Sequence, residues 1–146
     1  MDWHVLEFNQ LNTTQLYALL QLRAEIFVVE QNCAYQDIDG WDQAALHILG
    51  ERQQELLCYA RILGPGLRYA EPSIGRVINK RSARRGGLGR QLMNRALQEC
   101  SKKYPGMAIR ISAQHYLEQF YLSLGFSVVS EPYLEDGIPH IEMLKG

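Results

Sequence analysis

Apolar residues recur along this chain at two spacings, one typical of strands and one typical of amphipathic helices. Alternating or continuously apolar segments predict strands over residues 2–8, 45–51, 55–63, 74–79, 107–114, 127–134 and 140–145. Apolar residues three and four positions apart predict helices over residues 12–31, 86–104 and 116–126. Strands interrupted by helices favour an α+β or mixed α/β domain built around one sheet.

Local signals mark the ends of the predicted helices. Asn12, with Gln15 three residues later, resembles a capping box at the start of the first helix. Pro105 and Gly106 end the second helix, and Gly125 closes the third. The second helix carries one apolar stripe, made of Leu88, Leu92, Ala96 and Cys100 with Met93 and Leu97 beside it.

The composition is that of an ordinary folded chain. Its 146 residues are 47% apolar and 21% charged, a balance that argues against disorder. The length suits one domain that spans residues 1–146 and buries a sizeable core. The net charge of −1 excludes a protein that binds polyanions over its whole surface, so any basic site must be local.

Cysteine and histidine usage narrows the classes further. Cys33, Cys58 and Cys100 lie far apart without a C-x-x-C pair, so we expect packed free thiols in a reducing cytoplasm. The four histidines show no ligand spacing, so we expect no metal site. The N-terminus lacks the pattern of a secretory signal, and no apolar run approaches the roughly 18 residues of a membrane span. We therefore expect no membrane partner.

The one dense basic cluster stands where the fourth predicted strand runs into the second helix, in the stretch RSARRGGLGR (residues 81–90). Glycines let the backbone approach a ligand closely, and the N-terminus of a helix carries a partial positive charge. Together with the arginines of the stretch, these features favour phosphate binding. The stretch matches neither a Walker A loop nor the G-x-G-x-x-G dinucleotide pattern, because Leu92 occupies the third glycine position.

Two other interpretations of this stretch stay open, a solvated basic loop and a nucleic-acid-binding patch. Nucleic-acid binding is disfavoured because the chain is nearly neutral and no aromatic residues interleave with the basic ones.

The pattern [Arg/Gln]-x-x-Gly-x-[Gly/Ala], here Arg84, Gly87 and Gly89, resembles the acetyl-CoA pyrophosphate loop of the GNAT N-acetyltransferase superfamily. The segment AQHYLEQFYLSLGF is similar to a second GNAT motif, with Gln114 where asparagine is usual and Leu117 where alanine is usual. The stretches LRAEIFVVEQNCAYQDIDGWD and DGIPHIEM resemble the ElaA-like branch of the superfamily. The resemblance covers essentially the whole chain.

The resemblance implies a GNAT-like fold, with a central, mostly antiparallel sheet of about six to seven strands and about four helices. It also implies acetyl-CoA as co-substrate, with the pantetheine arm lying along the fourth strand. The implied cofactor-binding residues are Arg76, Val77, Ile78, Arg84, Arg85, Gly86, Gly87, Leu88, Gly89, Arg90, Gln114 and Phe120. The implied partners are a small-molecule or peptide amine and a second copy of the chain in a homodimer, with no nucleic acid.

Three residues are candidates for catalysis. The resemblance gives Tyr121 the role of the acid that protonates the departing thiolate, where the residue alone would suit a core aromatic. The base that frees the amine stays open between Glu30, His140 and a chain of waters. His140 and His115 also suit a purely structural role.

The acceptor side is less sharply defined by the sequence. Glu30 is also a candidate substrate anchor, and Asp37, Asp39 and Asp42 follow the first helix beside Trp41. These aspartates suit either solvation of a loop or attraction of a cationic amine, with Asp37 and Trp41 as candidate substrate contacts. The predicted activity is transfer of an acetyl group from acetyl-CoA to a primary amine by direct attack. A domain that senses acetyl-CoA without turnover is the alternative, and a nucleic-acid-binding protein is a more distant one.

Overall fold

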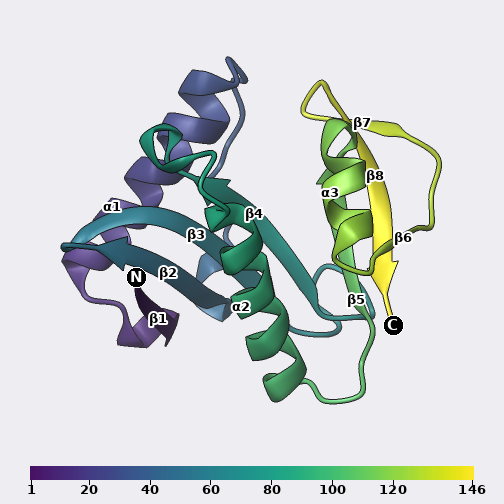
Figure 1. Ribbon diagram of the computed structural model, residues 1–146, viewed down its shortest axis with the longest axis horizontal. Coiled ribbons are helices and arrows are strands. Elements are labelled where there is room, and N and C mark those ends of the chain that lie inside the picture. Colours follow the sequence, from purple (N-terminus) through teal and green to yellow (C-terminus); the bar gives the residue numbers. More distant parts are fainter.

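The alternating apolar segments form the strands of one sheet in the computed structural model, which describes residues 1–146 (Figure 1). Neighbouring strands follow the order β1-β2-β3-β4-β5-β8-β6, and β7 pairs with β8 beside this path. Every neighbouring pair is antiparallel except β4 with β5. The strands are β1 (Asp2–Glu7), β2 (Leu46–Arg52), β3 (Glu55–Leu63), β4 (Ser73–Asn79), β5 (Ile109–Gln114), β6 (Ser127–Val128), β7 (Tyr133–Glu135) and β8 (Ile138–Lys145).

The three predicted helices are present, with bounds that differ slightly from those expected. The first runs as α1 (Thr13–Arg23) and continues into η2 (Ala24–Glu30), which has the wider turn of a π-helix. The predicted capping box is confirmed, because the Gln15 N–H donates to Asn12 Oδ1 at 2.7 Å and the Asn12 N–H donates to Gln15 Oε1 at 3.0 Å. The others are α2 (Leu88–Lys103), α3 (Glu118–Ser123) and the 3-10 turns η1 (Phe8–Gln10), η3 (Asp42–Ala44), η4 (Arg81–Ala83) and η5 (His115–Leu117).

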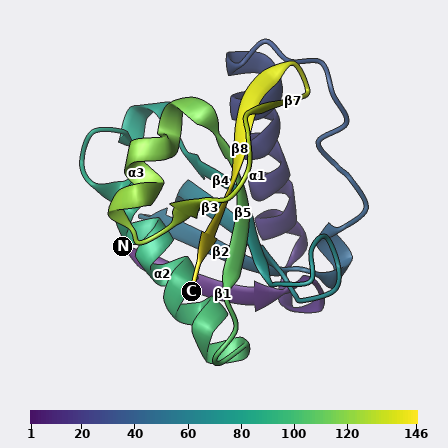
Figure 2. The same ribbon diagram turned by 90° about the vertical axis from the view of Figure 1, so that its right-hand side faces the viewer.

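Hydrophobic packing on both faces of the sheet holds the helices in place. Figure 2 shows α1 on one face and α2 with α3 on the other. The apolar stripe predicted for α2 is confirmed, since Leu88, Leu92, Ala96 and Cys100 are buried in the larger core cluster. A smaller cluster forms between α1 and the sheet around Leu19. No helix combines the length and apolar character needed to cross a membrane.

The C-terminal strands differ from the prediction. The segment 127–134 was expected to form one strand, but it is divided into β6 and β7 by residues 129–132. Pro132 lies in this break, and proline has no N–H to donate to a ladder. The last strand also begins earlier than expected, because Asp136 and Gly137, both at positive φ, form a tight turn that joins β7 to β8.

The parallel neighbours β4 and β5 stay paired over a very short length. Only Ser73 and Arg110 are in register, and the Arg110 N–H donates to the Pro72 carbonyl at 3.0 Å. Beyond this point the two strands diverge (Figure 1). A bulge, in which Arg76 has a φ of 50°, further bends β4 between the pairs Arg61–Gly75 and Tyr59–Ile78. The edge of β4 that faces β5 is therefore left without a strand partner over most of its length.

Candidate active site

The divergence of β4 and β5 opens a cavity of about 550 Å³ through the sheet. Side chains and backbone of residues 73–79 form one wall, and residues 111–114 of β5 with Phe120 and Tyr121 of α3 form the other. The π-helical turn η2 closes one side, where Ile26, Phe27 and Glu30 line the space. The lining mixes apolar and charged groups, so the cavity suits a ligand with both apolar and polar parts.

One mouth of the cavity meets the glycine-rich loop that was predicted to bind phosphate. Gly87 is the N-cap of α2 at a φ of 78°, so no side chain caps the first N–H groups of this helix. No atom stands within 4 Å of a side-chain position at Gly86 or Gly87, whereas a Cβ at Gly89 would meet Asn79 Nδ2 at 2.9 Å. The loop thus presents free backbone donors at a helix N-terminus, an arrangement that fits a phosphate group.

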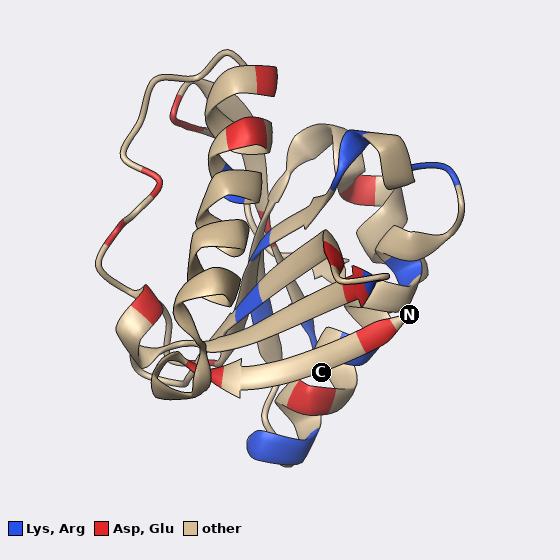
Figure 3. Ribbon diagram, turned by 90° about the vertical axis from the view of Figure 1, so that its left-hand side faces the viewer, with Lys and Arg blue, Asp and Glu red and all other residues tan.

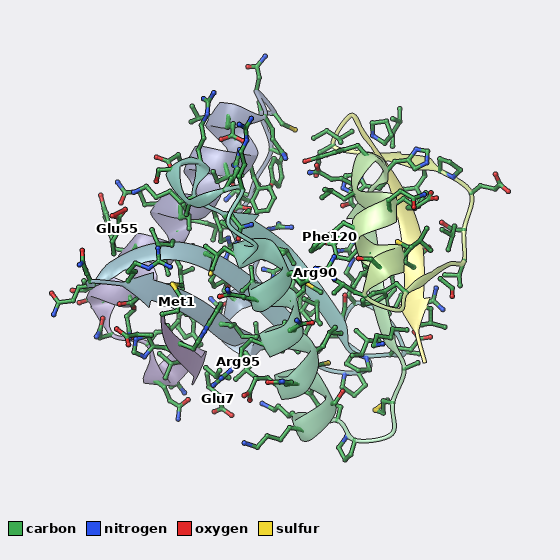
Figure 4. All side chains as sticks on the ribbon, viewed as in Figure 1. Met1, Glu7, Glu55, Arg90, Arg95 and Phe120 are labelled. Atoms are coloured by element: carbon green, nitrogen blue, oxygen red, sulfur yellow. The ribbon has the colours of Figure 1, made fainter.

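The arginines of this loop differ in their partners. Arg84 forms a two-pronged ion pair with Glu30, with Nη1–Oε2 and Nη2–Oε1 distances of 2.8 and 3.1 Å. Arg90 donates to Ser123 Oγ at 2.9 Å and lies over the ring of Phe120, 5.6 Å from its centroid (Figure 4). Arg81 and Arg85 are exposed and have no ion-pair partner in the chain. Positive charge is therefore available for an anionic ligand at this mouth.

Tyr121 reaches the cavity from α3. Its ring is held edge-on between Phe120 and Phe126, at centroid distances of 5.1 and 5.9 Å. The side chain is only 6% exposed and lines the cavity, yet its hydroxyl has no hydrogen-bond partner in the chain. Burial raises the pKa of Tyr121 to about 12, so the phenol keeps its proton at neutral pH. Because Tyr121 lines the cavity and its hydroxyl has no partner within the chain, the hydroxyl is available to a ligand.

The cofactor-binding candidates on β4 contribute backbone more than side chain. Val77 and Ile78 line the cavity, and the edge of β4 beside them is free. Arg76 also lines the cavity, but its Nε lies 2.9 Å from Asp37 Oδ1 and its Nη2 donates to Asp39 Oδ2 at 3.1 Å. Leu88 is buried in the core, so only its backbone N–H is available to a ligand.

Arg76 belongs to a largely buried cluster of three arginines and three aspartates, which we name the Arg–Asp network. Arg23 donates to Asp37 Oδ2 at 2.8 Å and to Asp42 Oδ1 at 2.7 Å. Arg61 donates to both oxygens of Asp39 at 2.8 Å and to Asp42 Oδ1 at 3.0 Å. The members are Arg23, Arg61, Arg76, Asp37, Asp39 and Asp42.

The network holds Asp39 and Asp42 in the charged form. Burial alone would raise the pKa of Asp39, but hydrogen bonds and charge from Arg61 outweigh burial and lower it to about 2. Burial opposes ionisation of Asp42 in the same way, and Arg23 and Arg61 lower its pKa below the ordinary value. Three positive and three negative charges cancel, as buried charges require.

The candidate substrate contacts Asp37 and Trp41 lie outside the cavity lining. Asp37 is 6% exposed, and Arg23, Arg76 and the Tyr35 hydroxyl already engage its carboxylate. Asp37 does not solvate the loop either, because its carboxylate is paired with arginines inside the protein. The segment between η2 and β2, whose acidic positions are visible in Figure 3, is fastened to the body of the domain through the network.

A polar surface forms the opposite side of the cavity, and three of its residues, Ser112, Glu135 and Arg68, were not predicted from the sequence. Ser112 and Gln114 of β5, Glu135 of β7 and His140 of β8 line it, together with Arg68 from the loop after β3. Arg68 Nη2 donates to Glu135 Oε1 at 2.8 Å. The Asp-Gly turn was the available signal, because a two-residue hairpin turn after Glu135 brings β7 back along β8 beside His140.

The sequence-predicted residues therefore divide into three groups, of which the first is Asp37 and Trp41, outside the cavity lining. Catalytic candidates Tyr121, Glu30 and His140 meet at one cavity, with the cofactor candidates Arg76, Val77, Ile78, Arg84, Gly89, Gln114 and Phe120. Arg85, Gly86, Gly87, Leu88 and Arg90 lie on the adjoining loop and helix without lining the cavity. No group of three or more His, Cys, Asp or Glu side chains is arranged to hold a metal ion.

Comparison of the chain with known proteins identifies its family. The family model described as acetyltransferase (GNAT) domain matches residues 15–146. The chain belongs to the GNAT family. Protein ElaA of Escherichia coli is 47% identical over 147 residues, covering 99% of this chain and 96% of ElaA. The predicted family and its ElaA-like branch are thereby confirmed.

Solved structures agree with this membership. An acyl-CoA N-acyltransferase from Pseudomonas aeruginosa is 44% identical with a TM-score of 0.95, and E. coli ElaA is 46% identical with a TM-score of 0.94. Each of these alignments covers 99% of both chains. An aminoglycoside 6'-N-acetyltransferase solved with coenzyme A is 16% identical with a TM-score of 0.75 over 99% and 96% of the two chains, and it shares the fold alone.

Family membership gives the broad activity and confirms the fold. The chain is an acyl-CoA-dependent N-acyltransferase of the GNAT class, with the mixed α/β fold that was predicted. The sheet has eight strands and carries three α-helices, close to the expected numbers.

Proposed function

We propose that this GNAT protein transfers an acetyl group from acetyl-CoA to a primary amine by direct attack of the amine on the thioester. The observation that carries the proposal is a single cavity that joins the free helix N-terminus and glycine loop at one mouth to the unpartnered Tyr121 hydroxyl inside. The GNAT domain match supports an acetyl donor, and the charged far side of the cavity supports an amine acceptor.

The loop before α2 would hold the pyrophosphate of acetyl-CoA. The N–H groups at Leu88 and Gly89 are available to phosphate oxygens, and Arg84, Arg85 and Arg90 would add charge-assisted hydrogen bonds. The free edge of β4 around Val77 and Ile78 would hydrogen-bond the pantetheine amides, as an added strand would. An N–H of the same edge would polarise the thioester carbonyl.

Tyr121 would assist departure of the thiolate. A thiol has an ordinary pKa of about 8.5, whereas burial raises the pKa of Tyr121 to about 12. Because the phenol is the weaker acid, it acts chiefly by donating a hydrogen bond to sulfur as negative charge develops there. The proton that the amine nitrogen loses as the amide forms then restores the phenol, so no free phenolate is needed.

Two alternative functions make different predictions. A domain that only senses acetyl-CoA would bind the cofactor and turn over nothing, whereas a nucleic-acid-binding protein would bind any duplex through the basic loop, with strong salt dependence.

The proposed partners are a small-molecule or peptide amine and a second copy of the chain, with neither nucleic acid nor membrane. The cytoplasm, where thiols stay reduced, suits the free cysteines.

Calorimetric titration with acetyl-CoA, and separately with a short DNA duplex, tests the cofactor site. We expect micromolar acetyl-CoA binding that weakens at least about tenfold in Arg84→Ala, since charge-assisted contacts to phosphate are worth about 1.5–3 kcal/mol. Arg52→Ala removes an exposed arginine that does not line the cavity and serves as the matched control. Salt-sensitive DNA binding without acetyl-CoA binding would overturn the proposal.

Turnover with a panel of alkylamines then separates the transferase from the sensor. We expect Tyr121→Phe to keep acetyl-CoA affinity close to that of the wild type and to lower turnover by about 10²–10⁴. Tyr17→Phe, at an exposed tyrosine on α1, is the control. Cofactor binding with no acetylated amine in the wild type would favour the sensor, and equal turnover in Tyr121→Phe would remove Tyr121 from the mechanism.

A further inference from the structure

The β7–β8 hairpin aims one histidine at the acceptor side of the cavity. His140 pairs in register with Tyr133 of β7 on one side and with Gln114 of β5 on the other. Its side chain lines the cavity although the residue is only 7% exposed. The Tyr133 ring stacks on the imidazole at a centroid distance of 6.3 Å and an angle of 26°, which fixes the plane of the ring.

Hydrogen bonding sets the tautomer of this imidazole. Nδ1 lies 2.7 Å from the Ile138 carbonyl, which can only accept, so Nδ1 carries the proton in the neutral ring. Nε2 is then the nitrogen with the free lone pair. Its nearest charged neighbour is Glu135 Oε2 at 3.5 Å, while Oε1 of the same carboxylate is held by Arg68. A neutral imidazole with a free Nε2 beside a carboxylate is arranged to accept a proton.

Glu30, the other side-chain candidate for the base, is in a different position. Both of its carboxylate oxygens are engaged by Arg84. Its carboxylate therefore lies at the loop that would hold the cofactor pyrophosphate, so Glu30 belongs to the cofactor side of the cavity.

We propose that His140 is the base that deprotonates the acceptor, and that Glu135 receives the acceptor ammonium and stabilises the resulting imidazolium. This inference rests on the proposed acetyl transfer and names its acceptor as an alkylammonium compound. One proton passes from the ammonium to His140 Nε2. The freed lone pair forms the C–N bond, the C–S bond breaks, and the thiolate receives a proton from Tyr121. The second proton lost by nitrogen restores Tyr121, and His140 releases its proton to solvent.

Charged and titratable groups around His140 belong to several elements. Glu135 and Tyr133 face it from β7, and Arg68 stands behind Glu135. From β5, the amide of Gln114 lies opposite in register, and Ser112 bonds the Tyr133 hydroxyl. Glu30 and Gln31 of the first helical segment line the same cavity, and Gln31 bonds Gln114 at 3.4 Å. Glu135 is the acidic group in direct contact with the ring, so its removal is the sharpest perturbation.

The decisive variant is His140→Asn, whose side-chain amide can still donate to the Ile138 carbonyl while providing no base. We expect unchanged acetyl-CoA affinity and a turnover loss of about 10²–10⁴ with alkylamines at pH 7. Hydroxylamine, which is largely unprotonated at pH 7, needs no base, so its acetylation should fall far less. His115→Asn is a matched control, because His115 Nε2 also lies 3.5 Å from a glutamate, Glu118, but outside the cavity lining.

The pH profile gives a readout that a merely structural role would not move. In His140→Asn the acidic limb of kcat/KM for an alkylamine should move towards the pKa of the ammonium itself, about 10.4, because only amine that is already unprotonated can then react. In Glu135→Gln, which keeps the imidazole, the limb should remain and KM for the ammonium should rise. An unchanged acidic limb in His140→Asn, or equal losses with alkylamines and hydroxylamine, would overturn the assignment. A wild-type protein that binds acetyl-CoA but acetylates no amine and no hydroxylamine would instead contradict the proposed transferase itself.

Discussion

Two arginine-rich regions of this protein have opposite chemistry. In the Arg–Asp network, Arg23 and Arg61 are buried and each contacts two aspartates at 2.7–3.0 Å. In the loop before α2, Arg81 and Arg85 are exposed and have no ion-pair partner. Arginine content alone therefore says little about ligand binding. The deciding feature is whether the chain itself supplies the carboxylates that the guanidinium groups need.

The two regions also act differently on the cavity. The network ties together α1, the segment after η2, β3 and β4, and through Arg76 it holds the bulge of β4 that faces the cavity. The loop contributes donors that await an external anion. Changes in the network should therefore be seen chiefly in folding stability, and changes in the loop chiefly in cofactor affinity.

The largest expected effect comes from Asp42→Ala. Asp42 Oδ1 bonds both Arg23 and Arg61, so its removal leaves buried guanidinium groups short of a partner. We expect the free energy of unfolding to fall by about 3–5 kcal/mol, measured by urea denaturation. Arg85→Ala in the exposed loop should change it by less than about 0.5 kcal/mol. Similar denaturation midpoints for Asp42→Ala and the wild type would contradict the structural role of the network.

Acid should weaken the same network to a smaller extent. The pKa of Asp39 is about 2 in the folded chain and that of Asp42 is also lowered, whereas an unfolded aspartate titrates near 3.9. Their contribution is complete above about pH 4 and is lost as the pH falls from about 4 to about 2, by about 2 kcal/mol for Asp39. Urea unfolding across this range measures the loss, and Asp39→Asn should show a shallower fall. An equal slope in that variant would exclude Asp39 as a source.

Most helices and strands could be predicted from the sequence, because the patterns that predict them involve residues close together in the chain. The capping box at Asn12 and the apolar stripe of α2 depend on residues within a few positions of each other, and both are present. The broken segment 127–134 was missed because its apolar residues continue past β6, while Pro132 and the pairing with β8 decide where strands form. Pairing of this kind depends on residues that are distant in sequence.

The same difference between nearby and distant residues decides which site residues could be predicted. Tyr121, Arg84 and Gly89 lie in short motifs, and all three line the cavity. Asp37 was a candidate substrate contact because acidic residues gather after η2, but its arginine partners come from α1 and β4, which no local pattern reveals. Glu135 and Arg68 meet across 67 positions, so their pairing also required the fold.

The smallest predicted effect concerns Arg84, which has features of both regions. Arg84 belongs to the loop, yet Glu30 binds it as an aspartate binds an arginine of the network. If a phosphate must displace this partner, Glu30→Gln should tighten CoA binding about two- to fivefold, since a half-exposed ion pair is worth about 0.2–1 kcal/mol. Glu25→Gln removes a nearby charge that has no ion-pair partner and controls for the general potential. Calorimetry with CoA measures both variants. Equal tightening in the two would reduce the effect to long-range charge, and weaker binding in Glu30→Gln would mean that Glu30 orients Arg84 for the phosphate instead of competing with it.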